Sequence, residues 1–126
     1  MFTYDIVIVG AGPAGSGAAL ELTKLDAAVA GRVLLIDKAV FPRSKLCAGG
    51  ISTDTDTELE HLGIEIDVPA VPVHTTQFLL PTGRLTFIRD NQFRVVSRTD
   101  FDHFLFKLLH PHSGLFYVYN LPYFKV

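Results

Sequence analysis

The chain of 126 residues has 11 Lys and Arg against 13 Asp and Glu, a formal net charge of −2. This length fits one domain or part of one, and 48% hydrophobic residues is too many for a disordered chain. The balanced charge, without a basic block, argues against a nucleic-acid partner held by its phosphates. A lone cysteine, Cys47, forms no internal disulfide and fits a reducing compartment, so we expect a cytoplasmic location.

The first twenty residues resemble neither a signal peptide nor a membrane span. No Lys or Arg precedes Lys24, so the basic start of a signal peptide is missing. Glycines and a proline interrupt the apolar run before it reaches the length that a bilayer requires. Any membrane contact is therefore expected to be peripheral.

The predicted elements begin with a β-α-β unit over residues 5–37. The continuous apolar run 6–9 is typical of a strand buried on both faces, as in a parallel sheet covered by helices. A helix is predicted over 13–25, because apolar residues recur at helical spacing and a proline suits the first turn. A second buried strand, 33–36, stops at Asp37, and the crossover is expected to be right-handed.

Beyond this unit the predicted elements are shorter. Residues 41–52 are rich in Pro, Gly and Ser and predict a loop with one helical turn at most. A helix is predicted over 53–62, ended by Gly63. Residues 68–73 contain two prolines, so at best they form an edge strand or a linking segment.

The second half of the chain carries a hairpin signal and a helix signal. Residues 77–80 and 84–88 flank Pro-Thr-Gly and predict a hairpin, to which 93–97 adds a third short strand. Thr99 and Asp102 have the spacing of a capping box and predict a helix that ends at about residue 109. The elements together predict an α/β fold: a Rossmann-type β-α-β unit with a parallel sheet, plus a small antiparallel hairpin or meander.

The segment Gly10-Ala11-Gly12-Pro13-Ala14-Gly15 fits the pattern G-x-G-x-x-G between a predicted strand and a predicted helix. Asp37 follows 22 positions after its last glycine, so the context is that of a dinucleotide-binding turn. The three glycines permit a tight turn, backbone approach to a pyrophosphate, and close packing of helix on strand. The helix N-terminus then faces the phosphates, and Asp37 accepts hydrogen bonds from the ribose hydroxyls.

Other readings of this turn are weaker. A P-loop is excluded because Ser16 and Gly17 stand where Lys and Ser or Thr are required. A 2′-phosphate on the ribose would be repelled by Asp37, which disfavours NADP at this site. A glycine-rich turn in a ligand-free α/β domain remains the structural alternative. The pattern itself leaves FAD and NAD open, since both contain adenosine diphosphate.

Residues 41–51, Phe-Pro-Arg-Ser-Lys-Leu-Cys-Ala-Gly-Gly-Ile, resemble the signature loop of the geranylgeranyl reductase family, FAD-dependent oxidoreductases related to the aromatic hydroxylases. Arg98, followed by Thr-Asp-Phe-Asp, resembles a second element of that family. Three motifs stand in the family's order over about residues 4–109. The resemblance implies that FAD is bound by Gly10, Ala11, Gly12, Pro13, Ala14, Gly15, Asp37, Lys38, Arg43, Cys47, Ala48, Gly49, Gly50 and Arg98.

Within that set the resemblance implies different places along the cofactor. The glycine-rich turn holds the pyrophosphate, Asp37 and Lys38 border the adenosine ribose, and Arg43 reaches the phosphate and ribose region. Residues 47–50 lie near the flavin ring. Cys47 is either a thiol that acts in catalysis beside the flavin or a small inert residue. No metal site is expected, because no cluster of ligands completes the pair His110 and His112.

The resemblance also implies an activity and an organisation. The parent reaction is hydrogenation of the double bonds of an isoprenoid or prenyl-lipid substrate, with NAD(P)H or ferredoxin as electron donor. A related monooxygenase or a non-catalytic remnant are the alternatives. Only the opening portion of the family is recognisable, so we expect an incomplete domain, inactive alone, that lacks its second half. Its expected parts are a dinucleotide unit (1–40), a flavin-proximal loop (41–52), an inserted helix and hairpin (53–98), a helix (99–109) and a divergent aromatic tail (110–126).

Overall fold

The computed structural model describes residues 3–109 and 116–119, which form two compact units. The first unit takes its residues from Met1–Lys45 and Thr99–Val126, and the second is Leu46–Arg98. The expectations for the two histidines at 110 and 112 and for the last aromatic residues of the tail lie outside the described residues. Each unit is considered by itself below.

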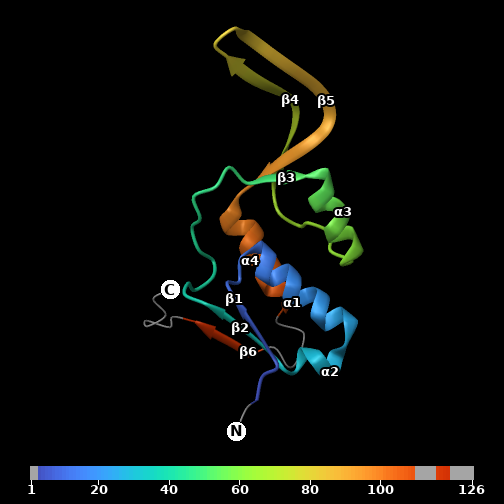
Figure 1. Ribbon diagram of the computed structural model, residues 1–126, viewed down its shortest axis with the longest axis vertical. Helices are drawn as coiled ribbons and strands as arrows, with labels where there is room; N and C mark the ends of the chain where they lie inside the picture. The colour runs from blue at the N-terminus through green and yellow to red at the C-terminus, as the bar shows by residue number, and fades with distance from the viewer. Residues whose placement is uncertain (1–2, 110–115, 120–126) are drawn as a thin grey trace. The chain divides into compact units, whose positions relative to one another are not determined.

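The first unit contains a parallel sheet of three strands in the order β1-β2-β6 (Figure 1). These strands are β1 (Ile6–Val9), β2 (Val33–Asp37) and β6 (Phe116–Tyr119). Between β1 and β2 the chain forms α1 (Pro13–Leu25) and the short helix α2 (Ala27–Ala30). The predicted β-α-β unit is thus confirmed. Strand β6 lies in the segment expected as a divergent aromatic tail, and it pairs with β2 so that β2 is the central strand.

The core of the first unit lies on one face of this sheet. Helix α1 packs against β1 and β2, and Leu20, Val33 and Leu35 are buried. The prediction that the first strand is buried on both faces was wrong: Val7 is 53% exposed and Val9 is 79% exposed. Since β1 is an edge strand with α1 on one side only, the opposite side chains of β1 stay uncovered among the described residues.

Helix α4 (Arg98–Leu109) returns the chain to the first unit and buries an apolar stripe that includes Phe101 and Leu105. The predicted helix is confirmed, but the predicted capping box is wrong in its register. The helix begins at Arg98, one residue before Thr99, so Thr99 lies within the first turn and does not cap it. No helix in the described part of the chain is long and apolar enough to cross a bilayer.

The second unit is an antiparallel sheet in the order β3-β5-β4 with one helix. Its elements are β3 (Gly50–Ser52), α3 (Thr53–His61), β4 (Ala70–Leu80) and β5 (Gly83–Val96). The predicted helix is confirmed, and Ser52 caps it by accepting a hydrogen bond from the backbone N–H of Thr55. Strand β3 falls where a loop was predicted, because three residues with a single apolar side chain give no periodic signal without their partner strand.

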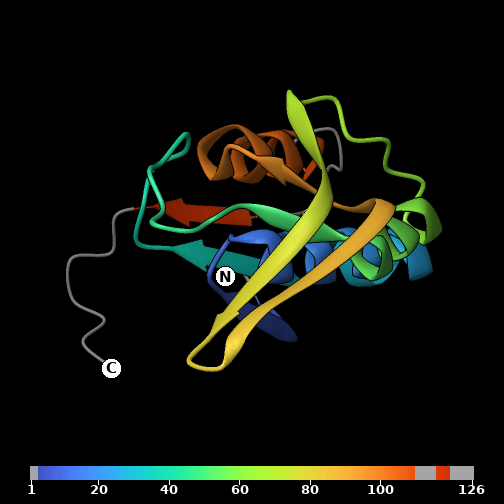
Figure 2. The ribbon, with the colours of Figure 1, turned by 90° about the horizontal axis from the view of Figure 1, so that it is seen from above.

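The hairpin of β4 and β5 is a long twisted ribbon (Figure 2). It is longer than predicted, since β4 begins at Ala70 and includes Pro72, which an edge strand tolerates. The third strand predicted over 93–97 is the end of β5, which continues past a register shift between Val73 and Thr75. Polar residues at 89–92 interrupt the alternation there, so the sequence reads as two strands.

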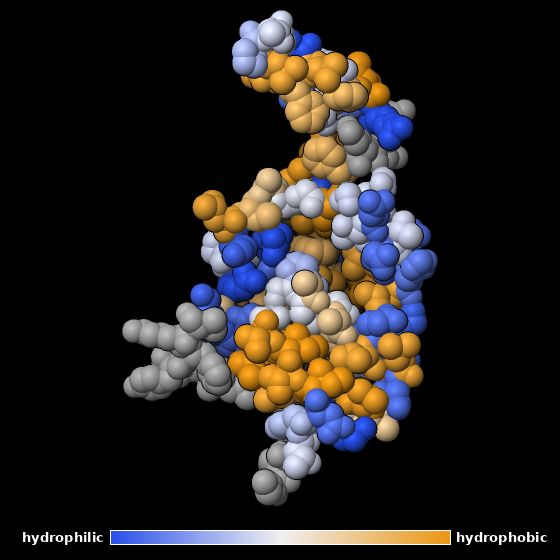
Figure 3. Space-filling view, in the orientation of Figure 1, coloured by the Kyte–Doolittle hydropathy of each residue, from blue (hydrophilic) through white to orange (hydrophobic). Residues whose placement is uncertain are grey.

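One face of the ribbon is apolar and exposed (Figure 3). The register places Phe78 opposite Leu85, and Phe87 on the same face two pairs further from the turn. The rings of Phe78 and Phe87 meet edge to face with their centroids 5.8 Å apart. Both rings are about half exposed, so this contact lies on an open surface.

Candidate dinucleotide-binding site

The glycine-rich turn joins the end of β1 to the start of α1. Gly10 has a φ of +105°, which favours glycine, and its N–H donates to the carbonyl oxygen of Ile36 on β2 (2.7 Å). Gly12 is the N-cap of α1 and provides no side-chain cap. The hydroxyl of buried Ser16 donates a hydrogen bond to the carbonyl oxygen of Ala11 (3.0 Å), which stabilises the turn. The first amides of α1 are therefore left without a side-chain cap, as an anion site requires.

Gly15 is where α1 packs most closely on the turn. A Cβ built on Gly15 would overlap the carbonyl oxygen of Gly10 and lie 3.3 Å from Cγ2 of Ile8. Only glycine allows this approach of helix to strand. The third glycine of the motif thus has the packing environment predicted for it.

Asp37 connects the end of β2 to the same turn. Its Oδ2 accepts a hydrogen bond from the backbone N–H of Ala11 (2.7 Å), and its Oδ1 accepts one from the N–H of Ala39 (2.8 Å). A carboxylate oxygen has a second lone-pair direction, so both oxygens retain the capacity to accept from a ribose hydroxyl. The side chain that was predicted to bind ribose therefore lies at the turn that was predicted to bind pyrophosphate.

Arg43 lies at the same turn. A Cβ on Gly12 would be 3.3 Å from its Nη2 atom, so the guanidinium borders the helix N-terminus. The Nη2 atom pairs with Oδ2 of Asp102 on α4 (3.1 Å), and the guanidinium carbon lies 5.0 Å from the centre of the Phe41 ring. Sequence analysis did not identify Asp102 as the partner of Arg43. The two residues are 59 positions apart, and no sequence pattern indicates that they form an ion pair.

The predicted site residues divide between the two units. The first unit brings together residues 10–15, Asp37 and Arg43, with Lys38 exposed beside Asp37. Residues 47–50 and Arg98 belong to the second unit, so the predicted contact of these residues with the cofactor stays a prediction. Cys47 is exposed and its Sγ accepts a hydrogen bond from the N–H of Gly49 (3.5 Å). Among the described residues no group of His, Cys, Asp and Glu could hold a metal ion.

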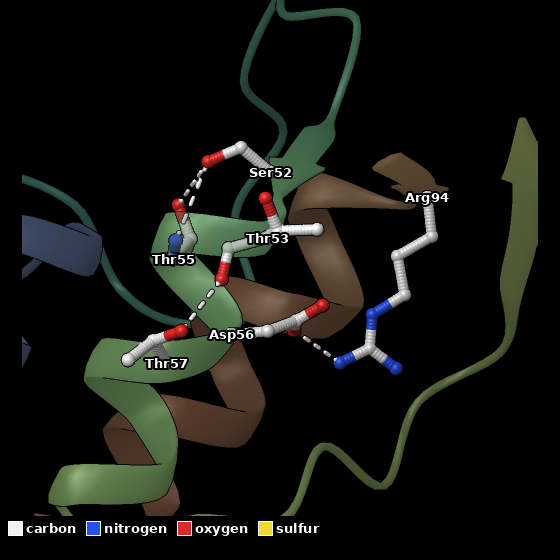
Figure 4. A network of polar contacts seen from close by, with 6 residues as sticks. All are labelled: Ser52, Thr53, Thr55, Asp56, Thr57 and Arg94. Carbon is white, nitrogen blue, oxygen red and sulfur yellow. Dashed lines mark hydrogen bonds and ion pairs between the residues drawn. The ribbon is translucent and has the colours of Figure 1, made fainter. Parts of the chain in front are cut away.

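A second polar cluster lies within the second unit (Figure 4). Nη2 of Arg94 on β5 pairs with Oδ1 of Asp56 on α3 at 2.5 Å, and Thr57 donates its hydroxyl to the carbonyl of Thr53 (3.1 Å). The pair borders a cavity of about 880 Å³ lined by α3, residues 63–66 and the bases of β4 and β5. This cavity was not predicted from the sequence, because its walls come from segments without a motif.

Solved structures share this architecture. A geranylgeranyl bacteriochlorophyll reductase-like protein of Thermoplasma acidophilum aligns with a TM-score of 0.69 and 24% identity over 94% of this chain and 30% of its own. A myxobacterial chondrochloren halogenase, a variant of FAD-dependent halogenases, gives 0.69 and 19% identity over 95% of this chain and 29% of its own. The chain has the fold of the opening portion of FAD-dependent oxidoreductases. A p-nitrophenol 4-monooxygenase of Pseudomonas putida aligns with a TM-score of 0.71 and 19% identity over 94% of this chain and 32% of its own.

Curated relatives match in sequence as well. An uncharacterized protein of Methanosarcina barkeri is 36% identical over 112 residues, which are 85% of this chain and 27% of the relative. A menaquinone reductase of Mycobacterium tuberculosis is 52% identical over 61 residues, 48% of this chain and 14% of the reductase. No protein-family model matches the chain. The chain thus spans about a third or less of the length of the flavoproteins and relatives it matches.

Proposed function

We propose that this chain is the FAD-binding N-terminal portion of a geranylgeranyl-reductase-like flavoprotein oxidoreductase. The observation that carries the proposal is the convergence of an Asp and an Arg on the N-terminus of α1. Asp37 is bonded to Ala11 at 2.7 Å, and Nη2 of Arg43 lies 3.3 Å from the position of a Cβ on Gly12. An acid for the ribose and a cation with free amides for the diphosphate are what an adenosine diphosphate moiety requires.

The chain's own residues would bind and orient the cofactor. The N–H groups of Gly12, Ala14 and Gly15 and the Arg43 guanidinium would hold the diphosphate, whose charge complements both. Asp37 would accept from the ribose hydroxyls while its bonds to Ala11 and Ala39 keep it in place. FAD supplies hydride-transfer chemistry when bound. Cys47 and the glycines after it would border the flavin ring, as the family resemblance implies.

For the reaction we propose hydrogenation of isoprenoid double bonds in the whole enzyme. The reductase-like solved neighbour and the 52% identity to a menaquinone reductase over 61 residues support a reductase. NAD(P)H or ferredoxin would be the electron donor. A monooxygenase is the second candidate, because a p-nitrophenol 4-monooxygenase has the same fold at a TM-score of 0.71.

A ligand series tests the proposed binding. Flavin fluorescence and calorimetry of the purified chain with FAD, riboflavin and ADP separate the two ends of the cofactor. We expect FAD to bind, ADP to compete with it, and riboflavin, which lacks the diphosphate and adenosine, to bind far more weakly. Equal binding of riboflavin and FAD, or no competition by ADP, would refute the assignment of the turn to the diphosphate.

A second experiment separates the reductase from the monooxygenase. The full-length relative of Methanosarcina barkeri would be incubated with FAD, a prenyl lipid and either NAD(P)H or reduced ferredoxin as electron donor, with and without oxygen. Saturated product formed without oxygen supports the reductase, whereas product that requires oxygen supports the monooxygenase and overturns the proposed reaction.

A further inference from the structure

We propose that Asp102 is a positioning residue of the FAD site, which holds the Arg43 guanidinium against the N-terminus of α1. The inference rests on the FAD binding proposed above and extends it to a residue that acts through Arg43. Asp102 stands on α4, 59 positions after the arginine that it contacts.

Both side chains of the ion pair are largely shielded from solvent. The Asp102 side chain is 0% exposed and that of Arg43 is 18% exposed, with 3.1 Å between Oδ2 and Nη2. An exposed ion pair holds its members loosely and contributes little, whereas a buried carboxylate is strongly destabilising unless it is paired. The pairing therefore restricts Arg43 far more than a surface contact would.

Helix α4 supports Arg43 a second time. Phe106 stands four residues after Asp102, on the same face of the helix. Its ring stacks on that of Phe41, with centroids 4.8 Å apart and planes 9° from parallel. The Arg43 guanidinium carbon in turn lies 5.0 Å from the centre of the Phe41 ring. One face of one helix thus supplies both the charge and, through Phe41, the aromatic surface that hold the arginine.

The held guanidinium lies beside Gly12, where the diphosphate is predicted. Its Nη2 atom is 3.3 Å from where a Cβ of Gly12 would stand, and Gly12 is the N-cap of α1. A guanidinium has five N–H donors, so pairing with Asp102 leaves others for phosphate oxygens. A long side chain that is already ordered loses less conformational freedom when it binds.

Asp102 has two opposing effects on the binding of a diphosphate at Arg43. Whether substitution of Asp102 weakens or strengthens FAD binding shows which effect is larger. Its negative charge offsets part of the Arg43 charge and weakens attraction to a diphosphate, while its hydrogen bond orients the guanidinium. We infer that orientation dominates. Asp102→Asn, which keeps the shape and removes the charge, should therefore weaken FAD binding by about 10- to 100-fold, the range for a charged hydrogen bond.

The test is a double-mutant cycle on FAD affinity, measured by flavin fluorescence of the whole chain. Asp100→Asn, at an exposed position of the same helix, is the matched control and should leave the dissociation constant unchanged. In an Arg43→Met background, Asp102→Asn should have no further effect on FAD affinity. A role in folding alone would lower thermal stability in both backgrounds and leave the affinity of the folded protein intact. Unchanged or tighter FAD binding by folded Asp102→Asn would overturn the inference.

A second variant keeps the proposal testable if Asp102→Asn does not fold. Phe41→Leu removes the aromatic surface under the guanidinium and leaves the ion pair, so FAD binding should weaken about two- to fivefold. An unchanged dissociation constant in this variant would count against positioning by α4. If the unaltered chain binds FAD and these variants bind equally well, only this inference falls. If the unaltered chain binds no FAD, the proposed function falls with it.

Discussion

The Cα of Gly15 faces the carbonyl oxygen of Gly10 so closely that a Cβ there would overlap it. The contact joins the first turn of α1 to the end of β1, and it forces the helix to begin beside the strand edge. The N-terminus of α1 consequently follows directly on Ala11, whose N–H donates a hydrogen bond to Oδ2 of Asp37 (2.7 Å).

Gly15→Ala should destabilise the chain, because the new methyl group meets backbone that cannot move aside. We expect a loss of about 1–3 kcal/mol in the free energy of unfolding, the range for overpacking. Gly17→Ala, two positions along α1, is the matched control: a Cβ there has open space within 4 Å, and alanine should stabilise the helix by about 0.5–1 kcal/mol. Denaturant unfolding of both variants measures the difference. Equal effects would contradict the packing argument.

Gly12→Val should abolish FAD binding while leaving the fold largely intact. Its side chain would stand where the diphosphate is expected and would press on the end of Arg43, 3.3 Å from the new Cβ. Gly12→Ala should give a smaller loss, since the end of an arginine side chain can shift. Fluorescence titration with FAD, accompanied by circular dichroism, separates binding from folding. Wild-type affinity in Gly12→Val would mean that the phosphate lies elsewhere.

Asp37→Ala should weaken FAD binding by about 1–3 kcal/mol, because charged hydrogen bonds to the ribose are lost. The change also leaves the N–H groups of Ala11 and Ala39 without their acceptor, so thermal stability should fall as well. Glu21→Ala, which removes an exposed acid on α1, is the control for net charge. The argument for ribose contact fails if calorimetry gives the same dissociation constant for Asp37→Ala and Glu21→Ala.

Gly49→Ala should disturb the second unit more than Gly63→Ala does. Both glycines have positive φ, +74° and +69°, so both alanines carry a backbone strain of about 1 kcal/mol. Only at Gly49 would the Cβ also overlap the carbonyl oxygen of Val96, beside the hydrogen bond from Val96 N–H to Gly49 O (3.0 Å). The difference in unfolding free energy between the variants measures the clash. An equal loss of unfolding free energy in both variants would mean that the positive φ accounts for the whole effect and that the clash with Val96 contributes nothing.

The sequence predicted best what depends on neighbouring residues. The β-α-β unit, its glycine-rich turn and the helix over 53–61 follow from periodicity, caps and turn residues that act within a few positions. The likeness to flavoproteins related to the geranylgeranyl reductases also came from local motifs, and the solved structures confirm that fold. Local signals therefore identified the class of fold and the turn at its centre.

Features that depend on pairing between distant segments were missed. Strand β3 exists because Gly50–Ser52 pairs with β5, and β6 exists because it pairs with β2. The exposure of Val9 was misjudged because an apolar run does not tell which faces are covered. Likewise, Asp102 was assigned to a capping box, whereas the structure pairs it with Arg43. For β3, β6 and Asp102 the determining contact joins residues more than 25 positions apart.

The open side of β4 has a consequence for how this chain meets other polypeptides. Among residues 3–109 and 116–119, no strand pairs with the outer side of β4, and the only proline of β4, Pro72, stands near its first residue. From His74 to Leu80 the strand has neither a lysine nor a proline. Natural proteins often use these residues to prevent an edge strand from pairing with another chain. An added strand is therefore expected to extend the ladder at this edge, and a lysine introduced at Gln77 would be the smallest change that blocks it.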